Sequence, residues 1–282
     1  MNVATVSLTD PDASATFAES LRQTGFAIVT GSPLTDELVN AMTSAWTRFF
    51  AADARAKREY LHDRPGQATL CGFWPVSESE TAVGASRPDL KEFFHVLPGA
   101  SLPPGVARLT YRYRSLALDL GRRLLAGLAD VDGGRLGERL SPAHSVLRIV
   151  HYPPLDACER PDAVRAAAHE DINLLTVLPV ADAPGLEVRG SDGRWIGLAG
   201  RPGDVVINAG DMLAELSAER YPSTTHRVIN PDDGSVARLA MPLFLTPHLD
   251  TVLSHRYTAG SYLEERLLAI SGGSQRPPRS KH

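Results

Sequence analysis

The chain has 282 residues, of which 43% are hydrophobic, and a formal charge of −4. Because its lysines and arginines are scattered and not gathered into blocks, neither a nucleic acid nor an anionic membrane surface is expected as a partner. No run of 18 apolar residues occurs, so no membrane span is predicted. The N-terminus lacks a basic start followed by an apolar stretch, so no secretion signal is predicted.

The first half of the chain predicts helices around one buried strand. Helical spacing predicts helices over 14–23, 35–50 and 111–129, and the glycine-bounded apolar run 25–31 predicts a strand. In the second helix, which Thr35 or Asp36 can cap, apolar side chains recur on one face. Those residues are Leu38, Met42, Ala45, Trp46 and Phe49.

Beyond about residue 145 the pattern changes to short apolar or alternating runs separated by turns rich in glycine, proline and aspartate. Many short strands at close spacing are typical of a β-sandwich or barrel. The predicted strands are 145–152, 172–180, 186–190, 195–198, 204–210, 226–230 and 238–247.

The C-terminal region predicts a helix over 261–270, followed by a tail rich in glycine, proline and arginine that we expect to be disordered. We therefore divide the chain into an N-terminal helical and β region (1–140), a β core (141–270) and the tail (271–282). The first two regions are expected to form one structural domain.

Cysteines are rare, since only Cys71 and Cys158 occur, far apart and without CxxC spacing. A disulfide framework is therefore not expected, and both residues are interpreted as ordinary thiols. A cytoplasmic protein is the corresponding prediction.

The segment AHEDINLLTVLP contains a candidate metal site. His169 and Asp171 lie two residues apart at the mouth of a predicted strand, where side chains at i and i+2 share a face. His226, on a distant predicted strand, supplies a third ligand. Two histidines and one carboxylate occupy one face of an octahedral Fe(II) and leave three adjacent positions open. Alone, an HxD pair also fits a surface histidine. His144, His151, His248 and His255 are weaker candidates, and all but His248 lack a carboxylate two residues further on.

Arg238 follows His226 by twelve residues, on the next predicted strand. A buried arginine binds a carboxylate through two parallel hydrogen bonds, so Arg238 is a candidate for the far carboxylate of 2-oxoglutarate. The alternative is a surface arginine paired with an acidic neighbour, but the apolar residues next to Arg238 favour its burial.

At this point the chain resembles a known family, the isopenicillin N synthase-like group of 2-oxoglutarate/iron(II) oxygenases. The similarity spans about 15–270, with its motifs in the family's order. They are TGFAIVTGSPL (24–34), WTRFF (46–50), DLKEFFHV (89–96), LRIVHYPPL (147–155), HEDINLLTVLP (169–179), NAGDMLAELS (208–217), YPSTTHRVINP (221–231), RLAMPLFLTPH (238–248) and TAGSYLEERL (258–267).

The resemblance implies a mainly β fold with helices, a distorted double-stranded β-helix or jelly roll with N- and C-terminal helices packed outside it. It implies a dioxygenase that uses Fe(II), 2-oxoglutarate and O2, hydroxylates a small organic metabolite or amino-acid-derived substrate, and releases succinate and CO2. The resemblance also implies that the enzyme acts in secondary metabolism. The family's iron ligands match His169, Asp171 and His226, and its co-substrate residues match Arg238 and Tyr152. Asn208 matches a family position near the core and is interpreted as structural.

One position departs from the family, which has Arg-x-Ser where this chain has Ala240 two residues after Arg238. Losing a hydrogen bond to a charged group costs about 1.5–3 kcal/mol. Tyr152, or a threonine such as Thr176 or Thr224, is a candidate to replace that hydrogen bond.

Substrate-binding residues follow only from the resemblance. It places Phe73, Trp74, Phe93, Phe94 and Leu245 at the border of the pocket, while the alternative for each is an ordinary core side chain. Two other functions fit the same fold: an iron oxidase or cyclase that does not use 2-oxoglutarate, and an inactive jelly-roll binding protein. A zinc hydrolase is disfavoured, because the helical HExxH spacing is absent.

Overall fold

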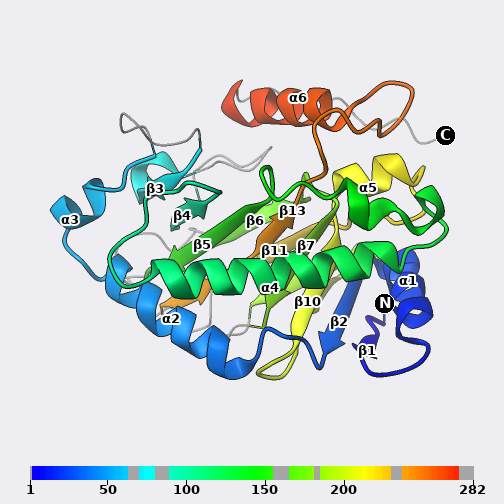
Figure 1. Cartoon of the computed structure of the whole chain (residues 1–282), viewed down its shortest axis with the longest axis horizontal. Coiled ribbons are helices and arrows are strands. Elements are labelled where there is room, and N and C mark those ends of the chain that lie inside the picture. Colours follow the sequence, from blue (N-terminus) through cyan, green and yellow to red (C-terminus); the bar gives the residue numbers. More distant parts are fainter. Residues whose placement is uncertain are drawn as a thin grey trace.

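Two β-sheets and the helices that cover them form the fold of the computed structural model, which describes residues 2–62, 70–79, 89–154, 165–180, 185–229 and 237–272. The larger sheet has the strand order β1-β2-β10-β7-β13-β5-β4-β3, with β12 paired to β5. The smaller sheet has the order β6-β11-β8-β9. This arrangement confirms the predicted mainly β fold with outer helices (Figure 1).

The strands of the larger sheet are β1 (Thr5–Ser7), β2 (Phe26–Thr30), β3 (Gly72–Trp74), β4 (Glu92–Val96), β5 (Val146–Tyr152), β7 (Leu175–Pro179), β10 (Val205–Ala209), β12 (Arg238–Ala240) and β13 (Leu243–Leu245). Those of the smaller sheet are β6 (Ala166–His169), β8 (Leu186–Arg189), β9 (Trp195–Gly197) and β11 (His226–Val228). The α-helices are α1 (Ala13–Thr24), α2 (Asp36–Phe50), α3 (Ala54–Arg58), α4 (Ala107–Ala126), α5 (Asp211–Leu216) and α6 (Ala259–Gly272). Short 3-10 helices cover Val76–Glu78, Asp132–Gly134 and Leu136–Arg139.

Helices α2 and α4 cover the outer face of the larger sheet, where the long α4 crosses the strands (Figure 1). The helix α2 begins as predicted, because the Thr35 side chain accepts a hydrogen bond from the Leu38 N–H at 3.3 Å. Its apolar face packs into the main core, where the Trp46 indole donates to the Thr110 hydroxyl at 3.1 Å. The outer layer therefore follows from the apolar stripes in the sequence.

Strands from the first 140 residues pair directly with the β core. Strand β2 is antiparallel to β10, with Phe26 opposite Asn208, and β4 is antiparallel to β5, with Phe93 opposite Val150. The N-terminal region thus extends the larger sheet on both sides of the core strands. Since β4 and β2 border the inner strands, this pairing brings N-terminal residues to the space between the two sheets.

Most predicted elements of the described regions are confirmed, within a few residues at their ends. Two strand predictions are wrong in part. The predicted strand 238–247 is divided into β12 and β13, since Pro242 has no N–H to donate to a ladder. The predicted strand 172–180 begins only at Leu175, because a turn precedes it. Cys158 and the predicted disordered residues 273–282 lie outside the described residues.

Candidate active site

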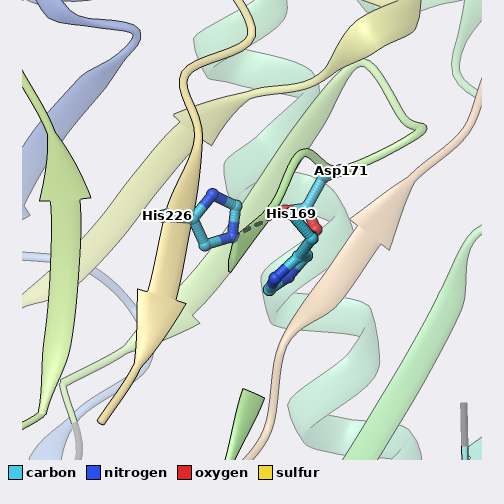
Figure 2. Close-up of side chains that lie close together, drawn as sticks. All are labelled: His169, Asp171 and His226. Carbon is cyan, nitrogen blue, oxygen red and sulfur yellow. Dashed lines mark ion pairs between the residues drawn. The ribbon is translucent and has the colours of Figure 1, made fainter. Parts of the chain in front are cut away.

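Three side chains converge between the two sheets. His169 ends β6, Asp171 lies in the turn after it, and His226 begins β11. Because β6 and β11 are antiparallel partners, with His226 opposite His169, the two imidazoles lie side by side (Figure 2). The Asp171 carboxylate oxygens lie 3.8 Å from His169 Nε2 and 3.9 Å from His226 Nε2. One ligand atom from each residue lies within 4.8 Å of the other two.

Both histidines are oriented by the backbone. His169 Nδ1 lies 2.8 Å from the Ala167 carbonyl oxygen, and His226 Nδ1 lies 3.1 Å from the Thr224 carbonyl oxygen. A carbonyl only accepts, so each Nδ1 carries the proton and donates it. In the neutral form of each imidazole, Nε2 then presents a lone pair towards the Asp171 carboxylate, which is the tautomer that a metal ligand requires.

The Asp171 carboxylate is held from its other side. Its Oδ2 accepts hydrogen bonds from the Thr176 hydroxyl and from Asn208 Nδ2, the latter at 2.8 Å. Asn173 Nδ2 in turn donates to the Thr176 hydroxyl oxygen at 2.8 Å. These contacts fix the carboxylate in one orientation, so Asn208, interpreted from the sequence as structural, also positions a site residue.

Electrostatics keep His169 and Asp171 in the protonation states of metal ligands. Although 38% of the His169 side chain is exposed, desolvation of its imidazole and the neighbouring His226 lower its pKa to about 4. Burial alone would raise the pKa of Asp171, but the two histidines and the hydrogen bonds from Asn208 and Thr176 outweigh it and lower that pKa. At neutral pH His169 is therefore neutral and Asp171 ionised.

This donor set fits a divalent metal. Two neutral imidazole nitrogens and one carboxylate form the facial triad of non-haem Fe(II) sites, and ligands of such a site are oriented by hydrogen bonds like those described above. The described residues include no cysteine near the group. The arrangement thus favours iron over a thiolate-bound structural zinc.

The three candidate ligands line a pocket. Its lining also includes Arg238 and Tyr152, which are direct cross-strand partners on β12 and β5. Both are buried, and burial lowers the pKa of the Arg238 guanidinium. Gly185, with φ of 126°, leaves room there, since a Cβ on it would lie 3.3 Å from Arg238 Nη1 and 2.8 Å from the Ile229 carbonyl oxygen. The predicted pair therefore lies together in a cradle that a larger residue would fill.

The threonines considered as substitutes for a serine at Ala240 have other hydrogen bonds. Ala240 lines the pocket, two residues beyond Arg238. The Thr176 hydroxyl donates to Asp171, and the Thr224 hydroxyl donates to the Thr24 carbonyl oxygen at 2.9 Å. Thr224 is also absent from the pocket lining. Of the predicted substitutes, Tyr152 alone keeps its place beside Arg238.

Arg165 was not found by sequence reasoning. It is fully buried, its guanidinium carbon lies 5.9 Å from the centre of the Tyr152 ring, and burial followed by the charge of Arg238 lowers its pKa. A second guanidinium thus lies beside Tyr152, although Arg165 itself is not among the residues that line the pocket. Little in the sequence indicates that Arg165 is buried beside Tyr152, since it follows no apolar run and adjoins no motif residue.

Three of the predicted substrate residues lie in the main hydrophobic core. Phe73 and Phe94 pack edge-on against Phe49, with ring centroids 5.7 and 5.6 Å away, and Leu245 packs against Gly121 of α4. None of the three lines the pocket around the triad. Their strands explain this placement, because side chains alternate between the inner and the outer face and these three face the helices.

Trp74 and Phe93 lie on the opposite, inner face of β3 and β4. Their rings stack at 5.6 Å, and the Trp74 ring also stacks on His62 at 3.4 Å. Neither lines the pocket directly, but Phe93 lies against Arg148, which does. Sequence reasoning missed the lining residues Lys91, Arg148, Val150 and Phe244.

Comparisons with known proteins agree with this geometry. A sequence model of the 2OG-Fe(II) oxygenase superfamily matches residues 143–247, and a model described as "non-haem dioxygenase in morphine synthesis N-terminal" matches residues 3–110. The first range contains the triad, Arg238 and Tyr152, and the second contains the N-terminal strands that join the larger sheet.

Curated relatives and a solved structure extend the match over most of the chain. A 2-oxoglutarate-dependent dioxygenase 19 of Oryza sativa subsp. japonica is 32% identical over 81% of this chain and 68% of its own length. The homoarginine-6-hydroxylase 2-ODD-C23 of Glycine max is 28% identical over 82% of this chain and 76% of its own. A crystal structure of a protein described as an oxygenase from Shewanella oneidensis has a TM-score of 0.83 and 39% identity, covering 96% of this chain and 99% of its own. The chain therefore belongs to the 2-oxoglutarate- and Fe(II)-dependent oxygenase superfamily, and it is a dioxygenase of that family.

Proposed function

We propose that His169, Asp171 and His226 hold the Fe(II), that Arg238 and Tyr152 bind 2-oxoglutarate, and that the enzyme hydroxylates a small organic molecule. One observation carries this assignment: three oriented ligand atoms and a buried arginine line the same pocket. The pocket therefore combines a metal site with a cation that suits the far carboxylate of the co-substrate.

Bound Fe(II) with 2-oxoglutarate supplies the oxidising chemistry, in which one atom of O2 enters the succinate and the other enters a C–H bond of the substrate. The chain's own residues have simpler tasks. His169 and His226 keep a lone pair on Nε2, and Asp171 is kept ionised by its surroundings. Arg238 and Tyr152 orient the co-substrate.

The co-substrate assignment does not depend on a serine. The guanidinium of Arg238 provides a bidentate fork for a carboxylate, and Tyr152 lies directly across the strand pair from it. Arg165 adds a second buried positive charge beside Tyr152.

For the substrate we propose a small metabolite, with an amino-acid derivative as one example of the class. Support comes from the curated relative named a homoarginine-6-hydroxylase, which is 28% identical to this chain. That name also supports hydroxylation as the outcome. Phe73, Phe94 and Leu245 lie in the main core and outside the pocket lining, so of the predicted substrate residues we keep only Trp74, supported by the inner face that it shares with Phe93.

The cellular setting is likewise a proposal. We propose a cytoplasmic enzyme of secondary metabolism whose regions 1–140 and 141–270 act as one structural unit, supported by the pairing of β2 with β10 and of β4 with β5. Among the described helices, none has the length and apolar character needed to cross a membrane.

The test is the stoichiometry of turnover. Iron-loaded enzyme is supplied with O2 and a panel of small metabolites, with and without 2-oxoglutarate, and both succinate and oxidised product are measured. We expect one succinate for each product that gains one oxygen atom, and neither without 2-oxoglutarate. Product formation that continues without 2-oxoglutarate would instead support the same-fold oxidase, and an inactive binding protein would form neither compound.

A further inference from the structure

A second cation faces the pocket at the other end of β5. Side chains alternate along this strand, so Arg148, Val150 and Tyr152 all face inward, and all three line the pocket. The Arg148 backbone N–H donates to the Pro242 carbonyl oxygen at 2.9 Å, while Tyr152 lies opposite Arg238. Arg148 and Tyr152 are four positions apart along the strand, which corresponds to roughly 13 Å. Arg148 is therefore remote from the proposed co-substrate carboxylate.

The guanidinium of Arg148 is held in place by neighbouring side chains. It lies over the ring of Phe93 at 4.5 Å and over the ring of Phe244 at 5.4 Å. Its Nε donates to His95 Nε2 at 2.7 Å, and His95 Nδ1 in turn donates to the Leu70 carbonyl oxygen at 3.1 Å. These contacts fix the plane of the guanidinium, and a planar, pre-oriented fork suits a carboxylate.

Charge and polarity of the pocket agree with an anionic ligand. Its described lining includes three cationic side chains, Lys91, Arg148 and Arg238, but one carboxylate, that of Asp171. Lys91 Nζ forms an ion pair with Asp89 Oδ2 at 2.8 Å. Cations in a cleft with low-dielectric walls raise the local concentration of anions. The apolar walls are formed by Phe26, Val150, Leu178, Leu186, Val228 and Phe244.

We propose that the substrate is a carboxylic acid with a compact apolar body, and that Arg148 binds its carboxylate. The proposal rests on the proposed function, which assigns the far carboxylate of 2-oxoglutarate to Arg238. With that assignment, the two arginines divide the work: Arg238 binds the co-substrate and Arg148 binds the substrate. The apolar walls then enclose the body of the substrate.

The test compares acids with their amides. Iron-loaded full-length enzyme and 2-oxoglutarate are titrated without O2 against aliphatic and aryl monocarboxylic acids of graded length, each beside its primary amide. Binding is followed by the change in the absorption of the iron–2-oxoglutarate complex. The same pairs are then tested with O2 for stimulation of succinate release. We expect the best acid to bind at least tenfold more tightly than its amide, because the amide lacks the charge that Arg148 recognises.

Variants of Arg148 test whether this residue causes the preference for acids over amides. In Arg148→Gln the preference for the acid is lost, whereas Arg148→Lys keeps part of it, since lysine retains the charge without the fork. Arg189→Gln, at an exposed position on β8, serves as the control and keeps the full preference. Melting temperatures show that each variant is folded, and if Arg148→Gln does not fold, Arg148→Lys carries the test.

Amides that bind as well as acids, a panel in which no acid binds, or an unchanged preference in the Arg148 variants would each overturn the proposal. Failure of the proposed function has a different signature, because the wild-type enzyme would then bind no 2-oxoglutarate. In that case the acid and amide pairs are compared through thermal stabilisation of Mn(II)-loaded protein without the co-substrate, and the same acid preference is expected.

Discussion

Asn208 and Thr176 stand directly opposite each other on β10 and β7, and both donate a hydrogen bond to Oδ2 of Asp171. The register of two core strands thereby sets the orientation of a carboxylate that lies outside both strands. Because the same carboxylate faces both imidazoles, the register of the larger sheet and the geometry of the metal site are linked.

Asn208→Ala removes one of these two hydrogen bonds and is expected to weaken Fe(II) binding by about 10–100-fold, the usual effect of losing a group that orients a ligand. Metal affinity is measured by anaerobic titration with Fe(II) against a competing chelator. Asn40→Ala, at an exposed position on α2, is the matched control. An Asn208→Ala protein that binds iron as tightly as the wild type would show that the hydrogen bond has no role in the site.

Arg238→Gln is expected to weaken 2-oxoglutarate binding by about 10–100-fold, equivalent to about 1.5–3 kcal/mol for hydrogen bonds to a charged group. Iron affinity should remain unchanged, since Arg238 is not among the three candidate ligands. Calorimetric titration without O2 measures both constants, with Fe(II) added to metal-free protein and 2-oxoglutarate added to metal-loaded protein. Equal 2-oxoglutarate affinity in the variant and the wild type would move the co-substrate site elsewhere.

Gly185→Ala tests the cradle beside Arg238. The added Cβ would meet Arg238 Nη1 and the Ile229 carbonyl oxygen, and the positive φ of 126° adds backbone strain of about 1–3 kcal/mol. We expect a lower melting temperature together with weaker 2-oxoglutarate binding. Gly193→Ala separates the two effects, because Gly193 also has a positive φ, of 80°, but no neighbour within 4 Å of a Cβ. Gly193→Ala should lower the melting temperature without weakening 2-oxoglutarate binding. Equal 2-oxoglutarate affinity in both variants would argue against the cradle.

The lowered pKa of the Glu92 carboxyl should make the stability of the folded chain depend on pH. Burial would raise its pKa, but hydrogen bonds from His151 and Lys57 outweigh burial and lower the pKa below its ordinary value of 4.5. The unfolded chain therefore binds the proton more readily. The stabilisation is fully present above about pH 4.5 and is lost as the pH falls through the folded-state pKa.

Glu92→Gln is expected to lower the free energy of unfolding by about 3 kcal/mol at pH 7, because it breaks a largely buried ion pair with Lys57. The difference from wild type should shrink as the pH is lowered below 4.5. Urea denaturation at a series of pH values measures it, with Glu264→Gln at an exposed position of α6 as the control. A difference that does not vary with pH would contradict the assignment.

The sequence was sufficient for the outer helices and for the identity of the three candidate ligands. The stripe through Leu38, Met42 and Trp46 predicts which face of α2 is buried, and the spacing of His169 and Asp171 makes them neighbours whatever the strand register. These features depend on local periodicity, so they can be predicted from residues that are close together in the chain.

Features that depend on strand pairing could not be predicted in this way. Asn208 meets Asp171 only because β10 pairs with β7 in one register, and Arg148 faces the pocket only because β5 turns its even-numbered residues inward. The same alternation placed Phe94 in the core and Phe93 on the inner face, although they are adjacent in the sequence. A shift of one residue reverses each such assignment.

The central claim is that His169, Asp171 and His226 hold an iron that 2-oxoglutarate then chelates, and anaerobic titration of wild-type and Asp171→Ala protein tests it most directly. Wild-type protein is expected to bind one Fe(II) per chain and to develop the charge-transfer absorption of an iron–2-oxoglutarate chelate when the co-substrate is added. The variant, which lacks one of the three ligand atoms, is expected to lose both signals while remaining folded. Iron binding and a charge-transfer band that survive unchanged in Asp171→Ala would contradict the account.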